Sequence, residues 1–245
     1  MRSLAYTRFE LARTFRERRL FIFAFGFPLI LYYVIAVPNR HIRAFNGSGI
    51  SAPLYYMVGL ASFGTMMSMM SAGFRIAGER QVGWTRQLRI TPLSTRAYMR
   101  AKVLTAYTMA GVSLGLLYVA GATLGVSLDA GTWLEMTLLL LIGLVPFAAL
   151  GILAGHLFTP DSIGPAIGGT TAVLALLGGV WFPISSGGFL HDLAVVLPSY
   201  WLVQAAHIGI GGKAWGPMGW AVVVGWSVTA GLLAAEAYRR DTKRV

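Results

Sequence analysis

Long apolar runs separated by short polar segments dominate the sequence. Six runs of 18–24 residues contain a single formal charge, Glu135, which lies near the end of its run. Because an α-helix rises about 1.5 Å per residue and the hydrocarbon core of a bilayer is about 30 Å thick, each run is long enough to cross it. The pattern therefore predicts six transmembrane helices, at residues 20–37, 53–74, 103–126, 133–155, 163–182 and 218–235.

A further apolar stretch, residues 184–217, is less suited to crossing a membrane. It contains His191, Asp192, Pro198 and Lys213 among other polar or helix-breaking residues. Backbone at membrane depth must be helical or covered by protein, so we expect one or two short helices that dip into the outer leaflet and return.

The first 19 residues carry six arginines and no uninterrupted apolar stretch. Leu4, Leu11 and Phe15 share one helical stripe, a pattern typical of a helix that lies in the plane of the membrane interface. No small-residue cleavage site follows the first apolar run, so we expect a retained helix there and not a signal peptide. The fold is expected to be all-α, with an interfacial helix at residues 1–19 and a transmembrane domain at residues 20–245.

The distribution of basic residues predicts the orientation. With six spans, 17 of the 20 lysines and arginines lie on one side of the membrane, and only Arg40, Arg43 and Lys213 lie on the other. Basic residues favour the cytoplasmic side. We therefore expect a multi-pass protein of the bacterial plasma (inner) membrane with both termini in the cytoplasm, because a seventh span would place four C-terminal basic residues outside.

Composition agrees with this class. The chain is 56% hydrophobic and only 12% charged, against about 25% charged residues in soluble domains. It has no cysteine, which excludes disulfides and thiolate metal sites. The net charge of +11 would suit nucleic acid, but the basic residues lie between apolar runs, so membrane topology explains them and no nucleic-acid partner is expected.

The sequence shows no catalytic constellation. The phosphate-binding pattern G-x-x-x-x-G-K-[ST] and the zinc motif H-E-x-x-H are both absent, and no histidine has a carboxylate at triad or ligand spacing inside a span. His191 beside Asp192 is interpreted as a solvated loop pair. We expect no enzyme in this chain alone, no catalytic residue, no metal and no bound cofactor, so any ATP hydrolysis would belong to another chain.

Small and flexible residues recur in the spans. Five pairs fit the GxxxG pattern, which permits close helix packing but does not define a dimer interface. They are Gly111/Gly115, Gly121/Gly125, Gly151/Gly155, Gly164/Gly168 and Gly212/Gly216. The five methionines of the second span either fill gaps against neighbouring helices or form an adaptable wall for apolar ligands, and the sequence leaves both open.

The polar loop at residues 78–94, between the second and third spans, is long enough for a short helix ended by Pro92. Positive-inside topology explains its arginines. It does not explain Trp84 and Leu88, which are four residues apart and share one helical face. That apolar face favours a docking surface for another protein.

This loop resembles the corresponding loop of the permease subunits of ABC-2 type transporters, which typically reads E-R-E-x-G-T-L-E-x-L-x-x-T-P. The matching residues are Glu79, Arg80, Gly83, Leu88, Thr91 and Pro92. Gln81 and Arg86 replace the later acids, which leaves the charge pattern of the contact open. Residues 179–183 and the expected re-entrant segment extend the resemblance. The high ratio of arginine to lysine and the sequence of the loop are similar to those of actinobacterial drug and antibiotic exporters of the daunorubicin-resistance kind.

The resemblance implies half of a transporter. A second permease, identical or different, would complete the pathway, and a separate ATP-binding cassette protein would bind ATP and Mg²⁺ and drive export of an amphipathic or apolar compound. It implies contact with that protein through Glu79, Arg80, Gly83, Trp84, Leu88, Thr91 and Pro92. It points to Met66, Met70, Thr170 and Leu174 as the substrate pathway and to Phe182 and Pro183 as an outer gate. Membrane lipids would surround the spans.

Two other functions fit the same pattern. One is a permease of this architecture that moves a lipid or a lipid-linked glycan. The other is a membrane scaffold that transports nothing, whose loop binds some other cytoplasmic protein and whose activity does not depend on ATP.

Overall fold

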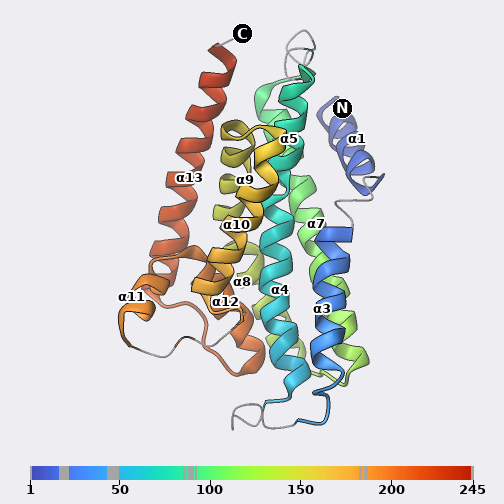
Figure 1. Cartoon of the computed structure of the whole chain (residues 1–245), viewed down its shortest axis with the longest axis vertical. Coiled ribbons are helices and arrows are strands. Elements are labelled where there is room, and N and C mark those ends of the chain that lie inside the picture. The colour runs from blue at the N-terminus through green and yellow to red at the C-terminus, as the bar shows by residue number, and fades with distance from the viewer. Residues whose placement is uncertain are drawn as a thin grey trace.

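In a computed structural model of the chain, the described residues are 2–16, 22–42, 50–84, 87, 91, 93–181, 184 and 187–243. Every regular element among them is helical, so the expected all-α class is confirmed. Figure 1 shows a bundle of long helices that run side by side, with the two chain ends at the same end of the bundle.

The helices follow one another with short connections. They are α1 (Arg2–Arg16), a π-helical turn η1 (Ile22–Gly26) that leads into α3 (Phe27–Ala36), α4 (Ala52–Met70), α5 (Ala72–Gln81), α7 (Thr95–Thr123), α8 (Ala130–Gly143), α9 (Val145–Leu157), α10 (Pro160–Gly178), α11 (Phe189–Val195), α12 (Pro198–His207), a 3-10 turn η3 (Ile208–Ile210) and α13 (Pro217–Lys243).

Four helical segments are long and apolar enough to cross a membrane. They are Ala52–Gln81, Thr95–Thr123, Ala130–Leu157 and Pro217–Asp241. They correspond to the predicted spans at residues 53–74, 103–126, 133–155 and 218–235. The third segment is interrupted at Leu144, two residues before Pro146, whose ring removes a backbone donor.

The other two predicted spans are not among these four segments. Residues 20–37 are described only from residue 22, where η1 begins and leads into the apolar helix α3 at Phe27. Residues 163–182 correspond to α10, a 19-residue helix that starts at Pro160 and carries Asp161 in its first turn. The total of six spans therefore stays a prediction that is consistent with the structure.

Helices α11 and α12 meet at an angle of 89° near Pro198. A sharp bend between two short apolar helices is consistent with a re-entrant segment and equally with a broken span, so the re-entrant segment at residues 184–217 stays a prediction. They lie toward the end of the bundle opposite the chain termini (Figure 1).

The paired helices α4 and α5 form the centre of the bundle. Within their most apolar window, 89% of the residues are buried inside the chain, against 22% for α13. Helix α9 crosses α5 closely because both helices present glycine there. A Cβ on Gly151 would lie 2.9 Å from the Met70 Cα, and one on Gly155 would lie 2.9 Å from the Gly73 carbonyl oxygen.

Candidate functional site

The last turn of α5 carries Glu79 and Arg80, the first two residues of the loop motif. The helix ends after Gln81 because Gly83 adopts a left-handed conformation with φ of 68°. The Val82 N–H lies within hydrogen-bonding range of the Gly78 carbonyl and closes the last turn. Gly83 is thus the residue that turns the chain out of α5, a role for which glycine is the least strained choice.

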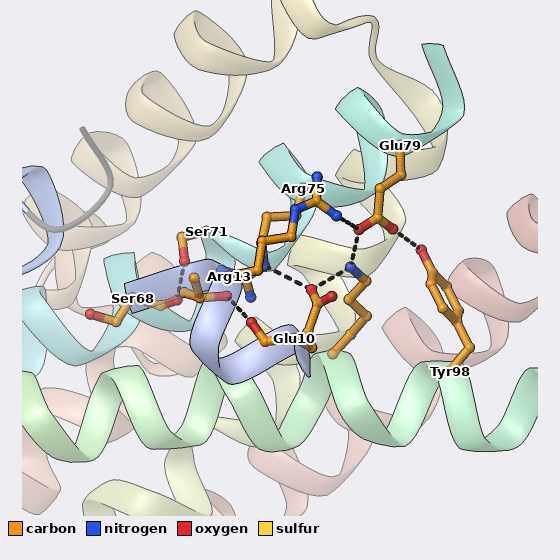
Figure 2. A network of polar contacts seen from close by, with 9 residues as sticks. Glu10, Arg13, Ser68, Ser71, Arg75, Glu79 and Tyr98 are labelled. Atoms are coloured by element: carbon orange, nitrogen blue, oxygen red, sulfur yellow. Dashed lines mark hydrogen bonds and ion pairs between the residues drawn. The ribbon is translucent and has the colours of Figure 1, made fainter. Parts of the chain in front are cut away.

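Glu79 faces inward and is 1% exposed. Its Oε1 accepts hydrogen bonds from Arg13 Nη1 at 2.9 Å and from Lys102 Nζ at 2.5 Å, and its Oε2 accepts one from the Tyr98 hydroxyl at 2.7 Å. Figure 2 shows Arg13 and Tyr98 reaching this carboxylate from different sides. Both carboxylate oxygens are therefore used within the chain.

Lys102 joins this carboxylate to a second one. Its side chain is fully buried, and its Nζ also lies 2.5 Å from Glu10 Oε1. Arg75 Nε lies 3.4 Å from the same Glu10 oxygen. We call these residues the Glu79 cluster: Glu10, Arg13, Arg75, Glu79, Tyr98 and Lys102. Burying charged groups is costly unless they are paired, so the cluster holds α1, α5 and α7 in one arrangement.

Helix α1 docks through its polar face. Glu10 and Thr14 are fully buried, whereas Phe15, part of the predicted apolar stripe, is 41% exposed. The side chain of Leu4 lies outside the described residues. Burial, reinforced by the nearby carboxylates of Glu10 and Glu79, raises the pKa of Tyr6 well above its usual value. Phe9 and Phe15 are exposed, so they would be available to lipid, while Tyr6 packs against Tyr98 of α7. The interfacial position of α1 stays a prediction.

Arg80 faces the other side of the bundle. Its Nε and Nη2 pair with the two Asp241 oxygens at 2.5 and 2.7 Å, and its Nη1 donates to the carbonyl oxygens of Gly155 and Phe158 at 3.0 and 3.3 Å. A guanidinium at the end of α9 suits carbonyls that have no partner within the helix. Arg80 thus links α5, α9 and α13.

His156 extends this second group. Its Nδ1 lies 2.8 Å from Asp241 Oδ2, and its ring packs edge-on against Tyr238 at 5.5 Å between centroids. The Tyr238 hydroxyl is in turn 3.0 Å from the Thr95 hydroxyl at the start of α7. We call Arg80, Gly155, His156, Phe158 and Asp241 the Arg80 cluster.

The predicted contact residues therefore fall into two groups. Glu79 and Arg80 are engaged inside the chain, whereas Thr91 is exposed and Trp84 is half-buried. Leu88 and Pro92 lie outside the described residues. Val82, which sequence reasoning did not select, is 70% exposed at the start of the loop. Contact of this loop with another protein stays a prediction.

Two of the predicted pathway residues meet at a cavity. Met70 and Thr170 both line a space of about 140 Å³ between α9 and α10, whose other walls are apolar side chains and small residues. Met66 is buried in the core outside this lining, and Leu174 is half-buried against the core. Phe182 and Pro183 lie outside the described residues. The described residues contain no group of three or more potential metal ligands.

Sequence reasoning missed the partners of Glu79 and Arg80. These partners are Glu10, Tyr98, Lys102, His156 and Asp241, none of which the sequence analysis selected as a candidate site residue. The sequence did offer two signals: Lys102 is followed directly by an apolar run, and Glu10 is one of only two acidic residues in an N-terminal segment that carries six arginines.

Comparison with known proteins agrees with this architecture. A family model described as "ABC-2 type transporter" matches residues 3–210, which extend from α1 to the end of η3. The chain is also 27% identical over 227 residues to "Putative transport permease YvfS" of Bacillus subtilis (strain 168), an alignment that covers 90% of this chain and 84% of that protein.

Proposed function

This chain belongs to the ABC-2 type transporter family, and from that premise we propose that it is the permease subunit of an ATP-driven exporter of amphipathic or apolar compounds. Membership of the family makes it a membrane component of a transporter. The observation that carries the proposal is the match over residues 3–210, because it includes the loop motif together with the helices that position it.

The ATP-driven half of the proposal rests on a separate protein. The chain has no phosphate-binding loop, so ATP and Mg²⁺ would bind to an ATP-binding cassette subunit. The loop after α5 offers that subunit the exposed Val82 and Thr91 with Trp84 beside them. Leu88 and Pro92 belong to the same proposed contact through the sequence motif, with Gly83 turning the chain toward it.

Orientation in the inner membrane follows from the arrangement of the charged ends. Helix α1, the end of α5 and the end of α13 gather at one end of the bundle (Figure 1), and 17 of the 20 basic residues belong to the segments on that side. That end is proposed to be cytoplasmic, since basic residues are retained there.

The apolar class of substrate is supported by the cavity beside Met70 and Thr170. A thioether and one hydroxyl among apolar walls suit a compound that is mostly apolar, and methionine adapts to differently shaped ligands. A second permease would complete the pathway, with Phe182 and Pro183 proposed at its outer end and Met66 and Leu174 deeper between the helices.

The test is copurification. The chain is co-expressed with the ATP-binding cassette protein encoded beside it and purified through a tag on this chain alone, and ATP hydrolysis is measured. We expect the ATP-binding protein to copurify with wild type and to be lost with Val82→Asp or Leu88→Asp, because a charge disrupts an apolar contact.

Ser94→Asp is the matched control. It places the same charge beside the loop at the N-cap of α7, where aspartate is as favourable as serine, so α7 is preserved. If no ATP-binding protein accompanies the wild-type chain, the exporter proposal fails and a scaffold without transport explains the loop better.

A further inference from the structure

We infer that Glu79 and Arg80 are positioning residues that pass motion of the loop after α5 to two separate groups of helices, instead of touching the ATP-binding subunit themselves. The inference rests on the proposed function, because the motion would come from that subunit. Its basis is the opposite orientation of the two neighbouring side chains.

On one side, Glu79 connects α5 to α1 and α7. Its two carboxylate oxygens accept from Arg13 of α1 and from Lys102 and Tyr98 of α7. The carboxylate is fully buried, so no surface of it is left for a partner protein. Short, charge-assisted contacts of this kind are stronger than neutral hydrogen bonds, so they transmit a displacement of α5.

On the other side, Arg80 connects α5 to α9 and α13. The Arg80 guanidinium makes four contacts: two to the Asp241 oxygens and two to carbonyl oxygens near the end of α9. The two-pronged pairing fixes the direction of the side chain as well as its distance. His156, with its side chain 1% exposed, holds Asp241 from the α9 side.

Glu79 and Arg80 lie close to the loop from which the motion would come. Glu79 and Arg80 lie within four residues of Gly83, the point at which the chain leaves α5 for the loop. Of the described α5 residues that make side-chain hydrogen bonds or ion pairs to other helices, these two lie nearest to the loop. Since α4 and α5 are the most buried pair of helices, the clusters give motion of the loop a route to α1, α7, α9 and α13 on the outside of the bundle.

The absence of cysteine makes the inference directly testable. Two single-cysteine reporters are placed at buried positions: Thr14→Cys on α1, beside the Glu79 cluster, and Ala234→Cys on α13, beyond the Arg80 cluster. Each reporter is introduced into three versions of the chain: the otherwise wild-type chain, the Glu79→Gln variant and the Arg80→Gln variant. The complex with the ATP-binding subunit is purified, and the rate of maleimide labelling is measured without nucleotide and after trapping with ATP and vanadate.

In the wild-type background we expect trapping to change the labelling rate of both reporters. Glu79→Gln should abolish the change at Thr14→Cys and leave it at Ala234→Cys, and Arg80→Gln should do the reverse. Glu236→Gln is the matched control, because it removes an exposed ion pair with Arg240 on the same end of α13 and should leave both responses intact. Arg80→Lys keeps the charge without the two-pronged contact and should resemble Arg80→Gln.

Three outcomes would overturn the inference. The first is that both reporters respond in both variants as in wild type. The second is that neither reporter responds in a wild-type complex that hydrolyses ATP. The third is that either variant, with an unchanged melting temperature, loses the ATP-binding subunit, which would make that residue a direct docking contact. Absence of the subunit from the wild-type preparation is a different result, because it removes the proposed function itself.

Discussion

At the scale of single residues, the Nζ atom of Lys102 lies between two buried carboxylates that would otherwise repel each other. Removing one member of a buried charge group typically costs about 3–5 kcal/mol, because the remaining charge keeps its desolvation cost and loses its partner. The stability of the chain should therefore depend strongly on this side chain.

Lys102→Met is expected to lower the melting temperature of the purified protein in detergent, measured by following unfolding with intrinsic fluorescence. Adding Glu10→Gln should restore part of the loss, since Glu79 would keep Arg13 and Tyr98. Lys213→Met removes an exposed lysine at the other end of the bundle and should change little. A Lys102→Met protein as stable as wild type would show that the cluster contributes no net stability.

A second residue-scale prediction concerns the cavity. Thr170→Phe places a larger apolar side chain at its edge and should change resistance to at least one compound in a panel of apolar antibiotics, with the ATP-binding subunit retained. The readout is the inhibitory concentration in cells that express the transporter. Val173→Phe, on an exposed part of the same helix, is the control. Equal resistance profiles for the two variants would show that the cavity is not part of the substrate pathway.

At the scale of elements, the packing of α9 against the end of α4 and the start of α5 depends on glycine. Gly151→Ala brings a Cβ to 2.9 Å from backbone atoms of Met70, which cannot move without shifting the helix. The expected loss of stability is about 1–3 kcal/mol, as for other overpacked contacts.

Gly111→Ala gives the comparison within the same chain. A Cβ there has nothing within 4 Å, so the substitution should be neutral or stabilising through the better helix propensity of alanine. Thermal unfolding of the two variants side by side measures the difference. Equal effects would mean that the close contact at Gly151 imposes no cost on a Cβ.

The helices also show which features a local sequence pattern predicts and which it does not. Predicted spans at residues 53–74, 103–126, 133–155 and 218–235 are helices because length and apolarity are properties of a segment alone. Among the five GxxxG pairs, Gly151/Gly155 lies at the α5–α9 crossing, while no atom lies within 4 Å of a Cβ on Gly111 or Gly115. The pattern is the same in both cases, and only the neighbouring helix distinguishes them.

At the scale of the whole molecule, the gathering of α1, the end of α5 and the end of α13 predicts a polarity across the membrane (Figure 1). Val82 and Phe189 are both well exposed and belong to opposite ends of the bundle. In intact cells, a membrane-impermeant maleimide should label Phe189→Cys and leave Val82→Cys unlabelled until the cells are opened. Labelling of Val82→Cys in intact cells would reverse the proposed orientation.

The sequence alone determined the all-α class, four segments able to cross the membrane and, through the loop motif, the transporter family, because each depends on residues close together in the chain. Only the tertiary structure decided what the motif residues touch. Lys102 meets Glu79 across 23 residues and Glu10 across 92, and Arg80 meets Asp241 across 161. Such pairings follow from how helices pack. Some of the basic residues that indicated topology, among them Arg13, Arg80 and Lys102, have carboxylate partners within the chain. Glu79 and Arg80, predicted to contact the ATP-binding subunit, are engaged inside their own chain.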